Sequence, residues 1–233
     1  MTSCESSVKW FMNLEGVGVV IPAYNAEKTI GRLIGELLEY GVDKKNIIVV
    51  DDGSKDYTSR VVTGFGLSLV CHEKNKGKGA ALMTGFDVAR TKKLNHVLTM
   101  DADGQHCVAE IKEFLKLKGT YDLIIGSRRY PSMPFLRRMT NRTTSLVISL
   151  LCKKHICDTQ SGFRCINPEI FDKVKLRTRN FQTEAELVVR AVRNRYRVGF
   201  VPITTIYNRG HSYINPLFDT MRFVNMALRF LWH

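Results

Sequence analysis

Short apolar runs alternate along this chain with segments whose apolar residues recur every three or four positions. The runs predict buried strands at 17–21, 46–50, 67–70, 96–100, 121–126 and 198–201, most of them ending in polar residues. The helical spacing predicts helices at 27–40, from 56 to 62, up to 91, at 108–117, 183–193 and 216–232. This order is typical of an α/β protein. We expect one Rossmann-like, mainly parallel sheet flanked by helices over 16–215, followed by an amphipathic C-terminal helix over 216–233.

The strand predicted at 96–100 runs directly into two aspartates, Asp101 and Asp103, followed by Gly104, Gln105 and His106. Ligands of open α/β sheets bind beyond the carboxyl ends of the strands. Residues two apart in a strand face the same way, so both carboxylates can reach one point. A hard divalent cation that also binds phosphate oxygens would relieve their repulsion. The plainer alternative is a turn with a solvated acidic corner.

Two more motifs follow predicted strands. Asp51 and Asp52 precede Gly53 and Ser54, so Asp52 is a candidate acceptor for a base or ribose, or a cap for the turn. The Gly77-Lys78-Gly79 loop opens a predicted helix, and its amides and ammonium suit a phosphate. The spacing is not that of a P-loop, and an ordinary basic loop is the alternative.

The second half carries two dense polar motifs. The segment from Asp158 to Arg164 surrounds one glycine with hydrogen-bonding groups, and Asp158 is a candidate partner for Arg164, a metal or a sugar hydroxyl. Glu184 and Glu186 stand near a predicted helix start. Stabilisation by the helix dipole is one sufficient reason for them. A contact with a sugar hydroxyl or a role as general base is the other.

The charge balance is strongly basic. Lys and Arg exceed Asp and Glu by 35 − 22 = 13, and the pI is about 9.6. This favours an anionic partner such as a phosphorylated substrate, an anionic membrane or nucleic acid. Between Asp122 and Asp158 the sequence has no acidic residue but several arginines and lysines. It also has few aromatics there and no nucleic-acid-binding motif, so we expect no nucleic acid partner.

The sequence predicts neither a secretory leader nor a membrane span, because no apolar run approaches the roughly 18 residues that a span needs. The helix at 216–232 has the pattern of a surface-lying membrane helix or of one packed on the sheet. The six cysteines have irregular spacing, which favours reduced thiols. A zinc site of Cys152, His155, Cys157 and Cys165 fits no common spacing.

Six motifs occur in an order that resembles family 2 glycosyltransferases with the A-type glycosyltransferase fold. They are Ile21-Pro22-Ala23-Tyr24-Asn25, Asp51-Asp52-Gly53-Ser54, Gly77-Lys78-Gly79-Ala80, Asp101-Ala102-Asp103-Gly104-Gln105, Gly126-Ser127-Arg128 and Ser161-Gly162-Phe163-Arg164. Asp158 to Arg164, with a tail from Val201-Pro202-Ile203 to Asn215-Pro216, narrows the likeness to dolichyl- or polyprenyl-phosphate sugar synthases. The chain departs from that pattern at Ala26, where an acid is frequent, and at Tyr213, where a basic residue is frequent; Arg209 is the candidate substitute for the latter.

The motifs and the resemblance together give a set of candidate residues. Donor-nucleotide contacts are expected from Pro22, Tyr24, Asn25, Val50, Asp52, Lys78, Asp101, Ala102 and Arg209. Ligands for Mg²⁺ or Mn²⁺ are expected from Asp101, Asp103 and Gln105. Acceptor-phosphate contacts are expected from Arg128, Arg137, Asn141 and Arg164, and the candidate catalytic residues are Asp103, Arg128 and Glu184.

The resemblance implies a metal-dependent, inverting transfer of a hexose from a nucleotide sugar of the GDP-mannose or UDP-glucose type to polyprenyl or dolichyl phosphate. It also implies a peripheral place at the cytoplasmic face of a membrane, against anionic lipid. One alternative keeps the donor chemistry but uses a hydroxyl of a polysaccharide or small molecule as acceptor, with Glu184 or Glu186 as a true base. A nucleotidyltransferase, which would release pyrophosphate, is a second alternative.

Overall fold

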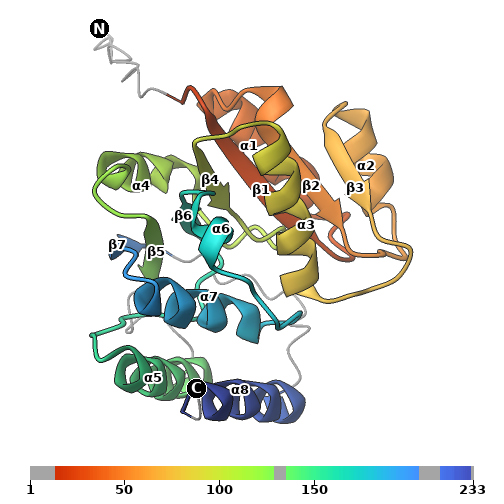
Figure 1. Cartoon of the computed structure of the whole chain (residues 1–233). Helices are drawn as coiled ribbons and strands as arrows, with labels where there is room; N and C mark the ends of the chain where they lie inside the picture. Colours follow the sequence, from red (N-terminus) through yellow and green to blue (C-terminus); the bar gives the residue numbers. More distant parts are fainter. Residues whose placement is uncertain (1–13, 129–134, 205–215, 232–233) are drawn as a thin grey trace, which may run out of the picture.

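Seven strands form one sheet in the order β3-β2-β1-β4-β6-β5-β7 (Figure 1). The structure, a computed structural model, describes residues 14–128, 135–204 and 216–231. All paired strands are parallel except β6, which runs antiparallel to both neighbours. The strands are β1 (Val17–Ala23), β2 (Ile47–Asp51), β3 (Ser68–Cys71), β4 (His96–Thr99), β5 (Leu123–Arg128), β6 (Arg164–Ile166) and β7 (Val198–Ile203).

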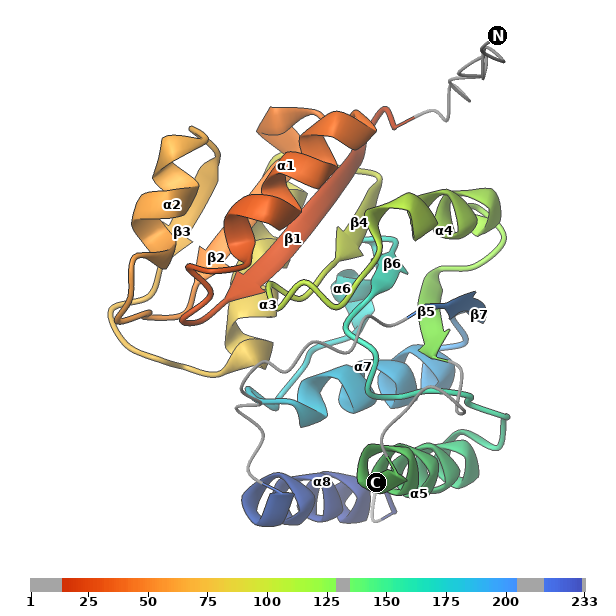
Figure 2. The same ribbon diagram turned by 180° about the vertical axis from the view of Figure 1, so that it is seen from behind.

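Helices cover both faces of this sheet (Figures 1 and 2). They are α1 (Ile30–Tyr40), α2 (Thr58–Gly64), α3 (Lys78–Thr91), α4 (Ile111–Leu117), α5 (Phe135–Cys152), α6 (Ile170–Lys173), α7 (Gln182–Arg193) and α8 (Pro216–Leu231), with short 3₁₀ turns at Lys44–Asn46 and Val108–Glu110. The mainly parallel sheet between helical layers confirms the fold class read from the sequence.

Alternation along β1 divides the core in two. Val19 and Ile21 pack with the apolar sides of α1, α2 and α4, whereas Val20 packs with α3 and α7 on the other face. Side chains two apart in a strand share a face, so one strand serves both clusters. Because both faces of the strand are covered, all seven of its residues are buried.

Helices α5 and α8 form a further layer, outside α7 (Figures 1 and 2). Ile148 and Cys152 of α5 and Met226 and Phe230 of α8 belong to the same apolar cluster as α7. The predicted C-terminal amphipathic helix is therefore present and packed. The division of the chain at residue 216 stays a prediction.

Three elements have no counterpart in the sequence prediction: α5, α6 and β6. Strand β6 has three residues, too few for a period of two to show. Helix α5 mixes arginine, threonine and serine with its apolar residues, and some of those apolar residues are exposed, which hides its periodicity. In the part of the chain that the structure describes, no helix is both long enough and apolar enough to cross a bilayer.

Candidate active site

The carboxyl ends of β1, β2 and β4 meet at one edge of the sheet, as expected for parallel neighbours. Ala23 at the end of β1 pairs with Asp51 at the end of β2, and Val20 pairs with Thr99, the last residue of β4. The loops that follow these strands therefore converge there. They carry Tyr24 and Asn25, Asp52, and Asp101 to Gln105.

Lys78 lies at the centre of the polar cluster on this edge. Its Nζ is 2.7 Å from Asp101 Oδ1 and 3.2 Å from Glu184 Oε1. The three side chains come from the start of α3, the end of β4 and the first turn of α7. The sequence predicted each of them separately, as a phosphate ligand, a metal ligand and a candidate base. The fold joins all three in one charged group.

Burial and charge act on these groups in opposite directions. Burial lowers the pKa of Lys78, but Asp101 and Glu184 together raise it by more than burial lowers it. The ammonium therefore stays charged. Burial raises the pKa of Asp101, yet the Lys78 ammonium leaves that pKa below its usual range. The pKa of Glu184 stays raised, because burial outweighs the effect of Lys78. The Lys78 ammonium beside Asp101 thus keeps that carboxylate ionised in spite of its burial.

His106 contacts the main chain of Asp101, and Gly162 leaves room for its carboxylate. The main-chain N–H of Asp101 donates to His106 Nδ1 at 3.3 Å, and the His106 ring stacks on Phe163. Burial lowers the pKa of His106 to about 4, so the ring is neutral and accepts that hydrogen bond. A Cβ added at Gly162 would stand 2.3 Å from Asp101 Oδ2. Only glycine lets this loop approach so closely.

The loop from Ala102 to Gln105 is fixed by α1 and by its own turn. Thr29 Oγ1 donates to the Ala102 carbonyl at 2.5 Å, and the Gln105 N–H donates to Asp103 Oδ1 at 3.0 Å. Asp103 is exposed, whereas Ala102 is buried. Among the described residues, no three His, Cys, Asp or Glu side chains gather as a metal cluster. The oxygen donors of Asp101, Asp103 and Gln105 fit Mg²⁺ or Mn²⁺ only if other oxygens complete the shell. A donor diphosphate can supply them.

Asp52 is buried and fastens the loop before α3. One carboxylate oxygen accepts from His72 Nδ1 at 2.6 Å and from the Lys76 N–H at 2.9 Å; the other accepts from the Gly77 N–H at 2.8 Å. His72 Nε2 in turn lies 3.0 Å from Thr84 Oγ1. The turn at Gly53 and Ser54 is capped instead by Asp51, which accepts from the Ser54 N–H. Contact between Asp52 and a nucleoside stays a prediction.

The other donor candidates line the same edge. Pro22 pairs with Val50 across β1 and β2, and both are buried. Asn25 has a left-handed backbone with φ of 49°, and its Oδ1 accepts from the Lys55 N–H at 2.8 Å. Tyr24 is half-buried. Arg209, also predicted for the donor, lies outside the described residues.

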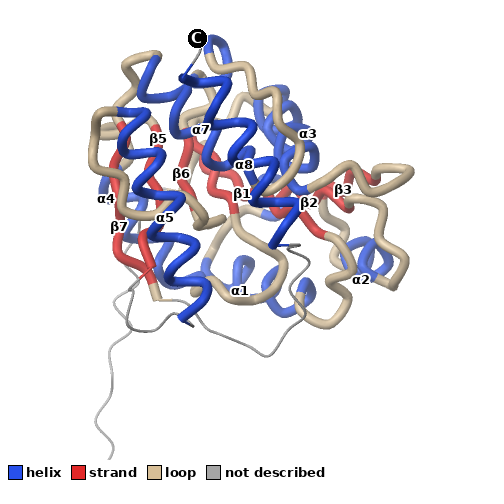
Figure 3. The backbone as a smooth tube through the Cα atoms, turned by 90° about the horizontal axis from the view of Figure 1, so that it is seen from below, coloured by secondary structure: helices blue, strands red, loops and turns tan. Residues whose placement is uncertain are grey.

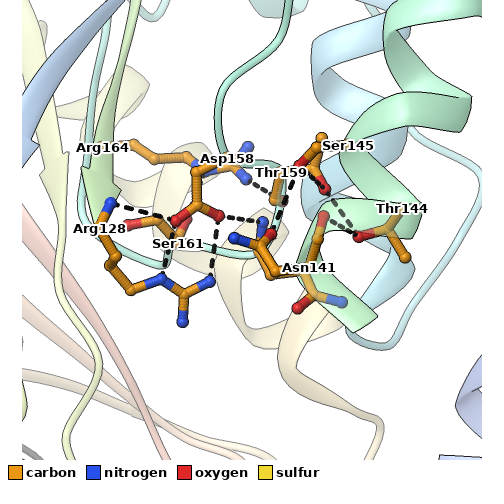
Figure 4. Close-up of polar contacts among 9 residues, drawn as sticks. Arg128, Asn141, Thr144, Ser145, Asp158, Thr159, Ser161 and Arg164 are labelled. Carbon is orange, nitrogen blue, oxygen red and sulfur yellow. Dashed lines mark hydrogen bonds and ion pairs between the residues drawn. The ribbon is translucent and has the colours of Figure 1, made fainter. Parts of the chain in front are cut away.

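Arg128 and Asp158 form a two-point ion pair at the end of β5 (Figure 4). Arg128 Nε donates to Asp158 Oδ2 at 2.8 Å and its terminal nitrogen donates to Oδ1 at 3.0 Å. The prediction that Asp158 pairs with Arg164 is therefore wrong. The buried Arg164 guanidinium donates to the carbonyls of Thr159, Ser161 and Glu184 instead, because these encircle it. Arg164 thus supports the loop from inside.

Beside this ion pair, α5 faces the loop 158–161 through a group of hydroxyl and amide side chains (Figure 4). Thr159 Oγ1 donates to Thr144 Oγ1 at 3.3 Å. Ser145 Oγ lies 3.5 Å from the same Thr159 oxygen. Asn141 Nδ2 and Ser161 Oγ are buried and have no hydrogen-bond partner within the described structure. Buried donors without partners are rare in folded proteins. These two groups are candidate contacts for a bound ligand.

The sequence singled out Asn141 but not Ser161, Thr144 or Ser145. A serine beside Gly162 was visible as part of a motif, yet only the fold shows that its hydroxyl lacks a partner. The side chain of Arg137, also predicted for an acceptor phosphate, lies outside those described. Glu186 differs from Glu184: its carboxylate accepts from the main-chain N–H groups of Arg177 and Thr178 and from Arg190 Nε. It stabilises the loop before α7.

The remaining sequence hypotheses concern the cysteines. The five cysteines that the structure describes are free thiols, as the spacing favoured. Cys152, Cys157, Cys165 and His155 do not assemble as a metal cluster in the described part of the chain. The sequence had already set that site aside.

A family model described as glycosyl transferase family 2 matches residues 18–176. The chain is 31% identical to a UDP-N-acetylglucosamine–dolichyl-phosphate N-acetylglucosaminyltransferase of Methanococcus voltae, over 81% of this chain and 85% of the relative. It is 30% identical to the polyprenol monophosphomannose synthase of Mycolicibacterium smegmatis, over 80% of this chain and 76% of the relative.

Solved structures give the same fold. Glucosyl-3-phosphoglycerate synthase from Mycobacterium tuberculosis, in complex with Mg²⁺ and uridine diphosphate, matches with a TM-score of 0.71. The match covers 92% of this chain and 77% of that one, at 20% identity. At that identity the likeness concerns the arrangement of strands and helices.

Proposed function

This chain belongs to glycosyl transferase family 2 and is a glycosyltransferase that uses a nucleotide sugar; from that premise we propose that its acceptor is a polyprenyl or dolichyl phosphate. The donor is of the GDP-mannose or UDP-glucose type, the transferred group is a hexose, and the anomeric configuration inverts. Two relatives named for lipid phosphate acceptors support the acceptor class.

One observation carries the proposal: Asn141 Nδ2 and Ser161 Oγ are buried donors without partners. They lie around the Arg128–Asp158 ion pair, and Asn141 belongs to the stretch between Asp122 and Asp158 that contains no acidic residue. An amide, a hydroxyl and a guanidinium are donors that a phosphate accepts well. The set proposed for the acceptor phosphate is Arg128, Asn141 and Ser161, with Arg137 from the sequence pattern.

A phosphate acceptor simplifies the chemistry at this site. A phosphomonoester loses its second proton near pH 6, so its oxygen is already a nucleophile at neutral pH. That oxygen attacks the anomeric carbon, the bond from this carbon to the donor phosphate breaks, and a nucleoside diphosphate leaves. Arg128 holds the acceptor in line and screens the repulsion between phosphates. No proton transfer is needed in this step.

Asp101, Asp103 and Gln105 are the proposed holders of Mg²⁺ or Mn²⁺. When bound, the metal neutralises charge on the diphosphate. The chain's own Lys78 adds a positive charge beside Asp101. Pro22, Tyr24, Asn25, Val50, Asp52 and Ala102 are proposed to shape the nucleoside side, and Arg209 to contact the diphosphate.

The proposed place of action is the cytoplasmic face of a membrane, with the protein peripheral to it. A lipid acceptor keeps its chain in the bilayer and exposes only its phosphate. The net charge of +13 favours an anionic surface.

The test is incubation of the protein with Mn²⁺, a short-chain polyprenyl phosphate and a panel of UDP- and GDP-sugars, with mass spectrometry of the lipid. A gain of one sugar from one donor, abolished in Asp103→Ala and by chelation, is the expected result. Donor hydrolysis with an unmodified lipid across the whole panel would refute the acceptor assignment.

A second candidate keeps the donor and uses a hydroxyl acceptor. The raised pKa of Glu184 favours it, since such a carboxylate is a better general base. Glu184→Gln separates the two candidates: a phosphate acceptor predicts substantial residual transfer, whereas a hydroxyl acceptor predicts its loss. Glu186→Gln serves as a comparison in which only stability should change.

A further inference from the structure

The large apolar side chains that the structure leaves exposed gather on one layer of the molecule. Nine such side chains are exposed among the described residues, and eight of them belong to α5 and α8; the ninth is Tyr57. The eight are Met139, Leu146, Leu150, Phe218, Met221, Val224, Leu228 and Leu231. Exposed apolar groups gathered in this way mark an interaction site.

The spacing of these residues places them on the outer face of each helix. In α5 the exposed positions 139, 142, 146 and 150 are three or four apart, whereas the buried positions 141, 145, 148 and 152 lie opposite. In α8 the exposed apolar row runs through 218, 221, 224, 228 and 231, and the buried row holds Met226 and Phe230. Each helix therefore has one face on the core and one face outward.

The two outward faces form one surface. Both helices pack on α7 through their buried rows, because those rows share one apolar cluster with α7. Viewed from below, α5 and α8 lie side by side in front of the rest of the fold (Figure 3). Their exposed rows consequently point the same way, away from α7. We call this surface, made of the eight apolar side chains above, the α5–α8 face.

Arginines border the α5–α8 face. The two helices contain five arginines and only one acidic residue, Asp219. Arg142 lies within the exposed row of α5, between Met139 and Leu146, and Arg222 and Arg229 are exposed on α8. A long arginine side chain can cover apolar surface with its stem while its guanidinium reaches a charged group nearby. Apolar rows edged by cations suit an anionic lipid surface.

We propose that the α5–α8 face is the membrane-docking surface of this glycosyltransferase and lies in the headgroup region of an anionic bilayer. A second copy of the chain fits less well, because a two-fold interface would bring together two basic faces whose helices each contribute arginines but together contain only one acidic residue. The inference deepens the proposed function and rests on it for the reason that the protein needs the membrane.

Docking through the α5–α8 face would fix the distance between the bilayer surface and the proposed acceptor site. Asn141 and Ser145 lie on the buried side of α5, and Leu146 and Leu150 on its outward side. One helix, about 10 Å across, therefore separates the bilayer surface from the groups proposed to bind the phosphate. A polyprenyl phosphate can keep its chain in the bilayer while its headgroup passes beside α5 to Arg128.

The test is co-sedimentation with vesicles of phosphatidylcholine, alone or mixed with phosphatidylglycerol. These vesicles lack polyprenyl phosphate, so binding cannot report on the acceptor site. The paired change Leu150→Asp with Met221→Asp removes two of the most exposed side chains, at 71% and 62% exposure. We expect at least about 100-fold weaker binding. Tyr57→Asp, at 67% exposure on another part of the surface, is the matched control and should bind as the wild type does.

A second variant tests the charge. Arg142→Gln with Arg222→Gln should weaken binding to the anionic vesicles by about 30-fold and leave binding to neutral vesicles unchanged. The inference would be overturned if the wild-type protein did not bind anionic vesicles, or if the Leu150→Asp, Met221→Asp variant bound them as tightly as the wild type does. A wild-type dimer that the same paired change dissociates would overturn it too.

One further assay separates this inference from the proposed function. Sugar transfer to a water-soluble, short-chain polyprenyl phosphate without vesicles should be the same in the wild type and in Leu150→Asp with Met221→Asp. Loss of vesicle binding together with intact transfer supports the docking surface. Loss of both would show that the change disturbs the fold, which contradicts the exposed position of these side chains.

Discussion

The donor side and the acceptor side of the site differ in how their polar groups are satisfied. On the donor side, Asp51, Asp52 and Asn25 each accept hydrogen bonds from main-chain N–H groups of neighbouring loops. On the acceptor side, Asn141 Nδ2 and Ser161 Oγ are buried without a partner. The loops proposed to bind the donor are thus hydrogen-bonded to one another, whereas the proposed acceptor side contains two buried polar groups without a partner. Substitutions on the first side should cost stability, and those on the second should cost acceptor binding.

Asp52→Ala should give the largest loss of stability. It leaves His72 and the N–H groups of Lys76 and Gly77 without their buried acceptor. We expect the free energy of unfolding to fall by about 3 kcal/mol, with a raised KM for the donor. Urea denaturation measures it. Asp87→Ala, an exposed carboxylate on α3, is the control; equal losses in the two variants would contradict the role of Asp52.

Acid should destabilise the fold through His106. Its folded pKa of about 4 lies below the ordinary 6.5, so between these values the unfolded state binds the proton more readily. Stability is therefore full above pH 6.5 and declines as pH falls toward 4, by up to about 3 kcal/mol. The measurement is the difference in unfolding free energy between wild type and His106→Gln across this range. A difference that does not change with pH would refute the assignment.

Gly162→Ala tests the boundary between the two sides. The new Cβ would stand 2.3 Å from Asp101 Oδ2, so the carboxylate must move. We expect kcat to fall about 100-fold with a loss of only about 1–2 kcal/mol in stability. Gly35→Ala, where nothing lies within 4 Å, is the control and should keep full activity. Normal activity in Gly162→Ala would mean that Asp101 need not keep this position.

Asn141→Ala should have the smallest effect on stability. Its Nδ2 makes no hydrogen bond and its Oδ1 accepts only a long one, from Ser145 Oγ at 3.4 Å, so we expect a change below about 1 kcal/mol. The KM for the lipid phosphate should nevertheless rise about tenfold. Asn141→Asp keeps the shape and replaces a donor with a charge that repels phosphate, so its KM should rise further. A destabilised Asn141→Ala with unchanged KM would show that the side chain is structural.

The strands and loops of the proposed donor side were easier to locate from the sequence than the elements of the proposed acceptor side, for a physical reason. Strands such as 17–21 and 46–50 are buried on both faces and read as continuous apolar runs, and their polar ends must meet at one edge. Asp101, Lys78 and Glu184 were each visible, but the contact that brings Glu184 to Lys78 spans 106 positions in the chain. Spacing alone carries no such information.

The acceptor side depends on features that leave little trace in sequence. Helix α5 shows no simple amphipathic pattern, because its buried face carries Asn141 and Ser145 as well as Ile148 and Cys152, while Met139, Leu146 and Leu150 are exposed. Arg128, the ion-pair partner of Asp158, was not among the alternatives that the sequence offered, because it is 30 positions away in the chain. That Ser161 Oγ lacks a partner follows only from the packed structure.

The central claim is that the unpartnered donors beside Arg128 receive a phosphate. The most direct measurement is the rate of sugar transfer to a short-chain polyprenyl phosphate compared with the same polyprenol without its phosphate, at equal concentration and with the donor that the panel identifies. We predict transfer to the phosphate and none to the alcohol, with the rate reduced in Asn141→Asp. Equal transfer to the alcohol would contradict it and assign the acceptor side to hydroxyl groups.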